Sequence, residues 1–322
     1  MALTGKRILI TCGAGFIGSH LAERLVDANE IAIYDSLQRN AIRFTTLAEH
    51  PNVRVIQGDV MELDDVRRAM RGCQVVVHAA AVAGIYSVVK NSLSTMQVNL
   101  FGTDRVLQAA RDVELQCLLH FSTSEVYGPF IHNGKEDGLS TIGPVGETRW
   151  VYAASKLASE HLAHAYAKEY GLPIVTVRPF NVYGPRQVGE GALRGMILRA
   201  LARQPLILYN DGTQIRAWCY VDDFVDGLVR CLETPSAHGH VFNLGNPQGT
   251  ITNLELAHMV LRLTSSDSSI VHQEHPGPEV EVRVPSIRKA TDLLGFAPQV
   301  TLEEGIRRTI PWYREHLDAA QT

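Results

Sequence analysis

A tyrosine and a lysine four residues apart offer the clearest chemistry in this sequence. Tyr152 and Lys156 lie within Trp150–Lys156, and a helix would place both side chains on one face. A positive charge beside a phenol favours the phenolate, and free tyrosine, with a pKa near ~10, needs such help to act as a base at neutral pH. The pair would suit removal of a proton from a sugar hydroxyl while hydride leaves the same carbon. Because this spacing also arises by chance, other elements must support it.

A glycine-rich motif near the N-terminus predicts a dinucleotide site. Residues 7–11 form a short apolar run typical of a buried strand, and residues 19–28 have the pattern of a helix. The motif between them follows the pattern G-x-G-x-x-G and contains Gly13, Gly15, Phe16, Ile17 and Gly18. Glycines here let the backbone approach a pyrophosphate, and the helix N-terminus presents unpaired N–H groups to it.

An acid at the end of the second expected strand points to the kind of dinucleotide. Asp35 follows the strand Glu30–Tyr34 and lies seventeen residues beyond Gly18. A carboxylate there accepts hydrogen bonds from the adenosine ribose and repels a 2′-phosphate, which favours NAD over NADP. Arg39 lies nearby and would weaken this preference.

Alternating strands and helices predict an α/β protein with a Rossmann-type doubly wound parallel sheet. We expect a smaller C-terminal α/β substrate lobe, formed by residues 181–216 with 249–322, beside a dinucleotide-binding domain of residues 1–180 with 217–248. Further strands are expected at residues 53–56, 75–78, 118–121, 174–178 and 241–244, and helices at 93–111 and 152–170. Residues 129–149 and 274–285 are expected to be loops, and short strands at 206–209 and 216–220 flank a turn at Asp211–Gly212.

Several residues at the strand ends would contact the cofactor or substrate. Asp59 and Val60 are expected near the adenine, and the small residues Ala79 and Ala80 would let the cofactor lie against the sheet. His78 is expected to be structural. At the end of residues 118–121, two hydroxyls and a carboxylate occupy the position where open α/β sheets bind ligands, and they belong to Thr123, Ser124 and Glu125.

Composition excludes several other classes of protein. The 322 residues carry a net charge of −4, so no basic excess points to nucleic acid or anionic lipid. No apolar run approaches the ~18 residues of a membrane span, and the N-terminus enters a strand pattern directly. The five cysteines are an odd number without a C-x-x-C pair, so we expect reduced, mostly buried thiols, no metal site and a cytoplasmic location.

Taken together, these motifs make the chain resemble an extended short-chain dehydrogenase/reductase of the NAD-dependent epimerase/dehydratase type, whose members act on nucleotide sugars. The resemblance covers nearly the whole chain. It rests on Thr11–Gly18, Asp35, Asp59, Asn99-x-x-Gly102-Thr103, Ser122–Gly128, Tyr152-x-x-x-Lys156, Arg178–Arg186 and Gly212–Arg216 leading to Tyr220–Asp223. The chain departs from the family at Cys12, which stands where the family's phosphate loop usually has its first glycine.

The resemblance implies roles for individual residues. Tyr152 would be the base on the C4 hydroxyl, Lys156 would hold the nicotinamide ribose and lower the phenol's pKa, and Thr123 would bind the same C4 oxygen. Asn99 would belong to the cofactor site. Asn181 and Arg216 would bind the diphosphate, and Tyr209 lies in the segment that borders the nucleotide base. A homodimer through the helices carrying Asn99 and Tyr152 is also implied.

Three reactions remain open after oxidation at C4. The sequence Thr123-Ser124-Glu125, Arg149 three residues before the tyrosine, and Arg283, which would seat a carboxylate, are similar to nucleotide-glucuronate decarboxylases, so decarboxylation of a UDP-linked glucuronate is the leading hypothesis. Residues 83–87 are more similar to 4-epimerases and 4,6-dehydratases, which remain alternatives. A dehydratase would need an acid beside Glu125, and a serine is a poor one. A catalytically silent cofactor-sensing scaffold is the contrasting hypothesis, and the intact Thr123, Tyr152 and Lys156 argue against it.

Overall fold

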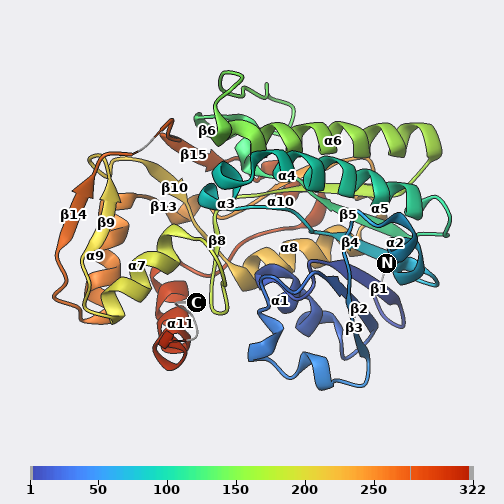
Figure 1. Cartoon of the computed structure of the whole chain (residues 1–322), viewed down its shortest axis with the longest axis horizontal. Helices are drawn as coiled ribbons and strands as arrows, with labels where there is room; N and C mark the ends of the chain where they lie inside the picture. The colour runs from blue at the N-terminus through green and yellow to red at the C-terminus, as the bar shows by residue number, and fades with distance from the viewer. Residues whose placement is uncertain (1–2, 276, 319–322) are drawn as a thin grey trace.

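The computed structural model describes residues 3–275 and 277–318, and within them seven parallel strands form the central sheet (Figure 1). Its order is β12-β7-β5-β4-β1-β2-β3. The strands are β1 (Arg7–Thr11), β2 (Glu30–Asp35), β3 (Val53–Gln57), β4 (Val75–His78), β5 (Cys117–Phe121), β7 (Ile174–Pro179) and β12 (Val241–Leu244). The chain winds outward from β1 in both directions, so the carboxyl ends of β1 and β4 flank a switch point where such sheets bind ligands. The predicted doubly wound sheet is confirmed.

Helices cover both faces of this sheet. Ile8 and Ile10 of β1 face a core shared with α1 (Phe16–Leu25) and α8 (Val221–Glu233). Leu9 faces the opposite core, shared with α2 (Leu63–Met70), α5 (Thr103–Ala110) and α6 (Val151–Tyr170). Burial on both faces explains why the strands have continuous apolar runs.

A second group of elements lies beyond the ends of the strands, at the left of Figure 1. The helices α7 (Ala192–Leu201), α9 (Asn253–Thr264) and α11 (Leu302–Glu315) pack with β9 (Leu206–Tyr209), which pairs with β14 (Ile270–Gln273). A four-stranded sheet has the order β13 (Thr250–Thr252), β10 (Ile215–Ala217), β15 (Val282–Pro285) and β6 (Phe130–Gly134). The short strands β8 (Val182–Tyr183) and β11 (Cys219–Tyr220) pair with each other, and α3 (Ile85–Lys90), α4 (Ser92–Gln97) and α10 (Arg288–Leu294) complete the main elements.

The structure corrects several sequence-based boundaries. Residues 129–149 contain β6, and residues 274–285 end in β15, which pairs with it. The strands β9 and β10 flank the expected turn but pair with β14 and with β13 and β15, not with each other. The expected helix 93–111 is interrupted by a π-helical turn at Val98–Gly102. These features depend on pairing between distant segments, which local patterns do not contain. The division into two lobes remains a prediction.

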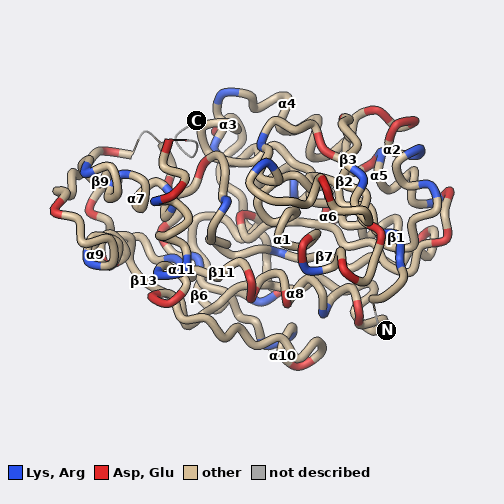
Figure 2. The backbone as a smooth tube through the Cα atoms, turned by 90° about the horizontal axis from the view of Figure 1, so that it is seen from below, with Lys and Arg blue, Asp and Glu red and all other residues tan. Residues whose placement is uncertain are grey.

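The cysteines and charges fit an ordinary globular surface and interior. Cys73, Cys117, Cys219 and Cys231 are buried free thiols, and Cys12 is half-buried. Acidic and basic residues are interspersed along the chain (Figure 2). In the described ranges, every helix is too short or too polar to cross a membrane.

Candidate active site

The phosphate-loop motif forms a tight turn between β1 and α1. A Cβ at Gly18 would lie 2.3 Å from the carbonyl oxygen of Cys12, so only glycine permits this approach. Gly15 is the N-cap of α1, and no side chain caps the helix there. Cys12 adopts a left-handed conformation with φ of 58°. The loop therefore presents a close backbone and a bare helix N-terminus, which fits a pyrophosphate.

Asp35 supports this loop as well as the predicted ribose site. Its carboxylate accepts hydrogen bonds from the backbone N–H of Ala14, at 3.0 Å, and of Leu37, at 2.7 Å. Burial raises the pKa of Asp35, and these two hydrogen bonds oppose the increase. Asp59 accepts from the backbone N–H of Met61 at 3.0 Å. Val60 is buried beside Asp59.

The guanidinium of Arg39 contacts protein groups that compete with a role as a phosphate ligand. Its guanidinium donates to the Ser87 hydroxyl at 3.0 Å and lies 3.7 Å from the Glu190 carboxylate. Glu190 also accepts hydrogen bonds from the backbone N–H groups of Tyr86 and Ser87. Arg39 thus contributes to holding α3, and nothing in the local sequence marked Glu190 as its partner.

The backbone of the strand-end residues Ala79 and Ala80 is held by the hydroxyl group of Thr11. Both of their backbone N–H groups donate to the side-chain oxygen of Thr11 at 3.1 Å. Asn99, in the π-helical turn, is fully buried. Its amide exchanges hydrogen bonds with the backbone of Val82, at 2.8 and 3.2 Å. These contacts fix the segment over which a cofactor would lie.

Helix α6 positions the tyrosine and the lysine. The helix is held against β7 by a buried ion pair in which Arg178 donates to both carboxylate oxygens of Glu160, at 3.1 and 2.6 Å. Lys156 is 1% exposed, and its ammonium has no hydrogen-bond partner among the described residues. Burial lowers the pKa of Lys156 to about 8. An unpaired buried ammonium needs an acceptor, and the hydroxyls of a cofactor ribose would meet that need.

The phenol of Tyr152 differs from the sequence-based expectation. Burial raises its pKa to about 12, the nearby charge of Glu125 adds to the increase, and a hydrogen bond with Thr123 opposes it. The role of Lys156 in lowering the phenol's pKa stays a prediction. The contact between Tyr152 and Thr123 brings the two predicted C4-oxygen partners together.

Glu125 lies between two guanidinium groups. Arg149 donates to its two carboxylate oxygens, at 2.8 and 3.2 Å, and Arg283 forms a second ion pair and also donates to the carbonyl of Gly128 at 3.0 Å. Burial alone would raise the pKa of Glu125, but these ion pairs outweigh it and lower the pKa to about 2. Glu125 is therefore ionised at neutral pH. Ser124 is buried next to it in a 3₁₀ turn, whose N-cap is Thr123.

Arg216 extends this basic cluster toward the second group of elements. It donates to the backbone carbonyls of Ile215, Val280 and Glu281, at 2.9, 2.6 and 3.3 Å. Burial lowers its pKa to about 10, and the charge of Arg283 contributes to this. The cluster formed by Arg149, Arg216 and Arg283 is suited to an anionic ligand.

The remaining predicted substrate residues lie at β8 and β9. Asn181 donates to the carbonyl of Ala217 at 3.1 Å and has a φ of 35°. Tyr209 shares a hydrogen bond of 2.6 Å with the hydroxyl of Tyr86, and its ring packs against His275 with centroids 5.0 Å apart. Tyr86 was absent from the predicted site residues, although residues 83–87 were singled out as a motif.

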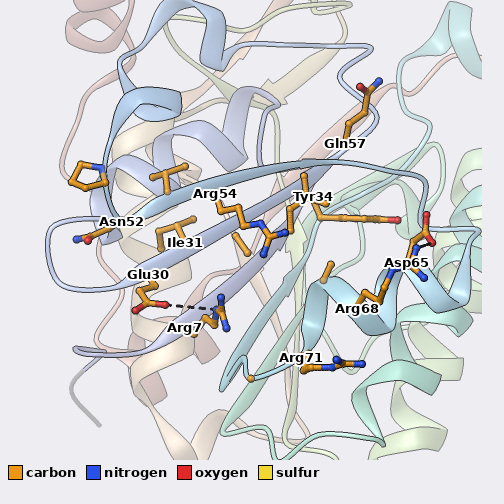
Figure 3. Close-up of a pocket in the computed structure, with 16 residues that line it drawn as sticks. Arg7, Glu30, Ile31, Tyr34, Asn52, Arg54, Gln57, Asp65, Arg68 and Arg71 are labelled. Atoms are coloured by element: carbon orange, nitrogen blue, oxygen red, sulfur yellow. Dashed lines mark hydrogen bonds and ion pairs between the residues drawn. The ribbon is translucent and has the colours of Figure 1, made fainter.

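A separate cavity of about 840 Å³ lies at the β2–β3 edge (Figure 3). Figure 3 shows Arg7 paired with Glu30, and Arg68 next to Asp65, from α2. None of the predicted site residues lines it. The chemistry described above is therefore located elsewhere.

Comparison with known proteins places this site in context. Residues 8–245 match the model of the NAD dependent epimerase/dehydratase family. The chain is 34% identical to a UDP-N-acetyl-alpha-D-glucosaminuronate decarboxylase of Bacillus cytotoxicus, covering 96% of this chain and 98% of that protein. It is 37% identical to UDP-glucuronic acid decarboxylase 3 of Arabidopsis thaliana, covering 93% and 86%. The solved UDP-glucuronic acid 4-epimerase of Bacillus cereus, in complex with UDP-glucuronic acid and NAD, superposes with a TM-score of 0.89 at 30% identity, covering 96% and 99%.

Proposed function

This chain belongs to the NAD dependent epimerase/dehydratase family, and we propose that it decarboxylates a nucleotide-linked hexuronate, with UDP-glucuronate as the first substrate to test. Its cofactor is NAD, in agreement with the predicted preference. Membership of the family is shown by the comparisons, whereas the reaction and the substrate are our proposal.

The observation that supports decarboxylation most is the pairing of an ionised Glu125 with Arg149 and Arg283. A 4,6-dehydration requires an acid beside Glu125 for the departing hydroxyl, and the neighbour is Ser124, whose hydroxyl is a poor acid. Glu125, with a pKa of about 2, holds no proton at neutral pH and does not replace that acid. A decarboxylation requires only that C4 becomes a ketone, because the carboxyl is then β to a carbonyl. The guanidinium groups of Arg149 and Arg283 are in addition suited to receive the substrate carboxylate.

The chain's own residues account for the proton transfers at C4. Tyr152 takes the proton of the C4 hydroxyl, and Thr123 holds the same oxygen by a hydrogen bond. When bound, NAD⁺ supplies the acceptor for the C4 hydride, a positive charge that favours the phenolate, and the hydride that returns to C4 at the end. As CO₂ leaves, negative charge develops on the C4 oxygen, where the Tyr152 hydroxyl and Thr123 can donate to it. C5 then takes up a proton from water, and Tyr152 returns its proton to the C4 oxygen as the ketone is reduced.

Cofactor binding is assigned to the residues around the switch point. The pyrophosphate would lie on the backbone of the glycine loop, the adenosine ribose on Asp35, and the adenine near Asp59 and Val60. Lys156 would donate to the nicotinamide ribose. The remaining contacts in this proposal are Gly13, Gly15, Phe16, Ile17, Gly18, Ala79, Ala80 and Asn99.

Substrate binding is assigned to residues 181–216 with 249–322. Asn181 and Arg216 would hold the diphosphate, and Tyr209 would border the base. Arg216 would exchange part of its bonding to backbone carbonyls for phosphate oxygens. We also propose a homodimer through the helices around Asn99 and Tyr152, and a cytoplasmic location, because the buried thiols are reduced.

The second candidate function is 4-epimerisation of the same nucleotide hexuronate. It is favoured by residues 83–87 and by the likeness to the solved 4-epimerase. An epimerase would retain the carboxylate in the 4-keto sugar, whereas a decarboxylase would release it.

Incubation of purified protein with UDP-glucuronate labelled at C6 and NAD⁺ separates the outcomes. Decarboxylation releases labelled CO₂ and leaves a UDP-pentose. If no label is released and UDP-galacturonate forms, the proposal is refuted in favour of epimerisation. In a parallel incubation with UDP-glucose, a 4-keto-6-deoxy product would indicate dehydration.

A further inference from the structure

His78 occupies the middle of a buried hydrogen-bond chain that joins the strand ends under the cofactor site to the helix of the catalytic tyrosine. The chain consists of Thr11, His78, Thr103, Asn99 and Ser155, and all five residues are 0–1% exposed. We propose that neutral His78, protonated on Nε2, is a positioning residue that sets the placement of Asn99 and, through Ser155, of Tyr152.

The hydroxyl of Thr11 fixes one nitrogen of the imidazole. Its oxygen accepts from the backbone N–H groups of both Ala79 and Ala80, at 3.1 Å, which occupies its two lone pairs. The hydroxyl hydrogen is then directed to Nδ1 of His78, which lies 2.9 Å away. Nδ1 is therefore an acceptor and carries no proton.

The other nitrogen is fixed by Thr103. In a neutral imidazole whose Nδ1 accepts, Nε2 carries the hydrogen. Nε2 lies 3.0 Å from the Thr103 oxygen, and the Thr103 hydroxyl donates to the carbonyl of Asn99 at 2.7 Å. Every donor along this path thus has one acceptor, so the protonation state of His78 follows from geometry. Complete burial and the charge of Lys156 also lower the pKa of His78, to about 3.

The chain continues from Asn99 to the catalytic helix. The Asn99 amide donates to the Ser155 hydroxyl at 3.0 Å, and Ser155 donates to the carbonyl of Tyr152 at 2.8 Å. Asn99 lies in the π-helical turn Val98–Gly102, a local irregularity of a kind frequently found at functional sites. The Thr103 hydroxyl links this turn to His78 by hydrogen bonds. The helix pattern in the sequence does not predict this link.

Matched substitutions at Thr103 separate positioning from packing. Thr103→Val keeps the shape and removes the hydroxyl, whereas Thr103→Ser keeps the hydroxyl. We expect Thr103→Val to lower kcat about 10-fold with KM for the sugar nucleotide within about 2-fold, and Thr103→Ser to retain at least half of kcat. Thr309→Val is the control, because the Thr309 hydroxyl is equally buried and donates to a carbonyl four residues earlier, at 2.7 Å, with no histidine attached.

Two results would overturn the proposal. One is an unchanged kcat in Thr103→Val together with a loss of thermal stability equal to that of Thr309→Val. The other is an equal loss of kcat in Thr103→Ser and Thr103→Val, since the hydroxyl would then not matter.

A spectroscopic measurement tests the protonation state without any turnover. The kinetic test of the Thr103 variants rests on the proposed function, because it needs a substrate. ¹⁵N NMR of the histidines in the whole protein with NAD⁺ needs no substrate. The His78 signals, assigned by their absence in His78→Gln, should show a hydrogen on Nε2 and none on Nδ1. A hydrogen on Nδ1 would refute the positioning chain, whichever reaction the enzyme catalyses.

Discussion

The hydroxyls of Tyr86 and Tyr209 lie 2.6 Å apart, although 123 residues separate the two tyrosines in the chain. Tyr86 is held by Glu190, which accepts from its backbone N–H at 2.8 Å, and Tyr209 lies at the end of β9. This tyrosine pair thus connects the first turn of α3 to the proposed base-binding segment.

Removing one hydroxyl should weaken substrate binding without affecting the chemistry. In Tyr86→Phe, the pair loses a hydrogen bond worth about 1 kcal/mol, so KM for the sugar nucleotide should rise about 5-fold with kcat within about 2-fold. Steady-state kinetics measure this. Tyr170→Phe is the control, since Tyr170 is also exposed but lies at the far end of α6. A fall in kcat at constant KM would contradict the assignment.

Loss of the phenol hydroxyl should stop the reaction and spare the fold. Tyr152→Phe is expected to lower kcat about 1,000-fold, because the C4 hydroxyl loses its base, while NAD⁺ still binds. Turnover assays and quenching of protein fluorescence by NAD⁺ provide the two measurements. Tyr166→Phe changes a tyrosine of the same helix and should retain activity. Substantial turnover in Tyr152→Phe would exclude Tyr152 as the base.

The Glu125 carboxylate should make folding stability depend on acidity. Its pKa is about 2 in the folded protein against the ordinary value of 4.5 for a glutamate, so its contribution is complete above pH 4.5 and is lost as the pH falls toward 2. The difference corresponds to stabilisation on the order of 3 kcal/mol. Urea unfolding between pH 6 and pH 3 should show a smaller acid-induced loss of stability in Glu125→Gln than in the unsubstituted protein. Equal losses would show that Glu125 does not govern this range.

Replacing Cys12 with glycine should stabilise the protein. Cys12 has a φ of 58°, a conformation that glycine adopts without steric cost, so Cys12→Gly should raise the free energy of unfolding by about 0.5 to 1 kcal/mol. Denaturant unfolding measures the gain. Ser265→Gly tests the same relief at the end of α9, where φ is 55°. Destabilisation in Cys12→Gly alone would show that packing of the thiol outweighs backbone strain.

The sequence contained enough to predict the sheet, the cofactor and the family, and too little to predict how the arginines are paired. Apolar runs and the glycine loop are local signals, so β1 and Asp35 were found where expected, and α1 begins and ends three residues earlier than expected. The ion pair of Glu125 with Arg283 depends on β6 pairing with β15, and neither strand has a strong local pattern. The raised pKa of Tyr152 depends on burial, and burial cannot be predicted from the spacing of residues along a helix.

The irregular pairing within β15 has a consequence for how relatives of this chain can diverge. The register shifts between Arg283 and Pro285 against β6, whereas residues 277–281 before the strand are outside it. Length changes before Val282 leave the alternation of the strand intact, but one residue inserted between Val282 and Arg283 would turn the guanidinium to the opposite face. Homologues should therefore tolerate insertions near Gly277 and exclude them from Val280, whose carbonyl accepts from Arg216, through the end of β15.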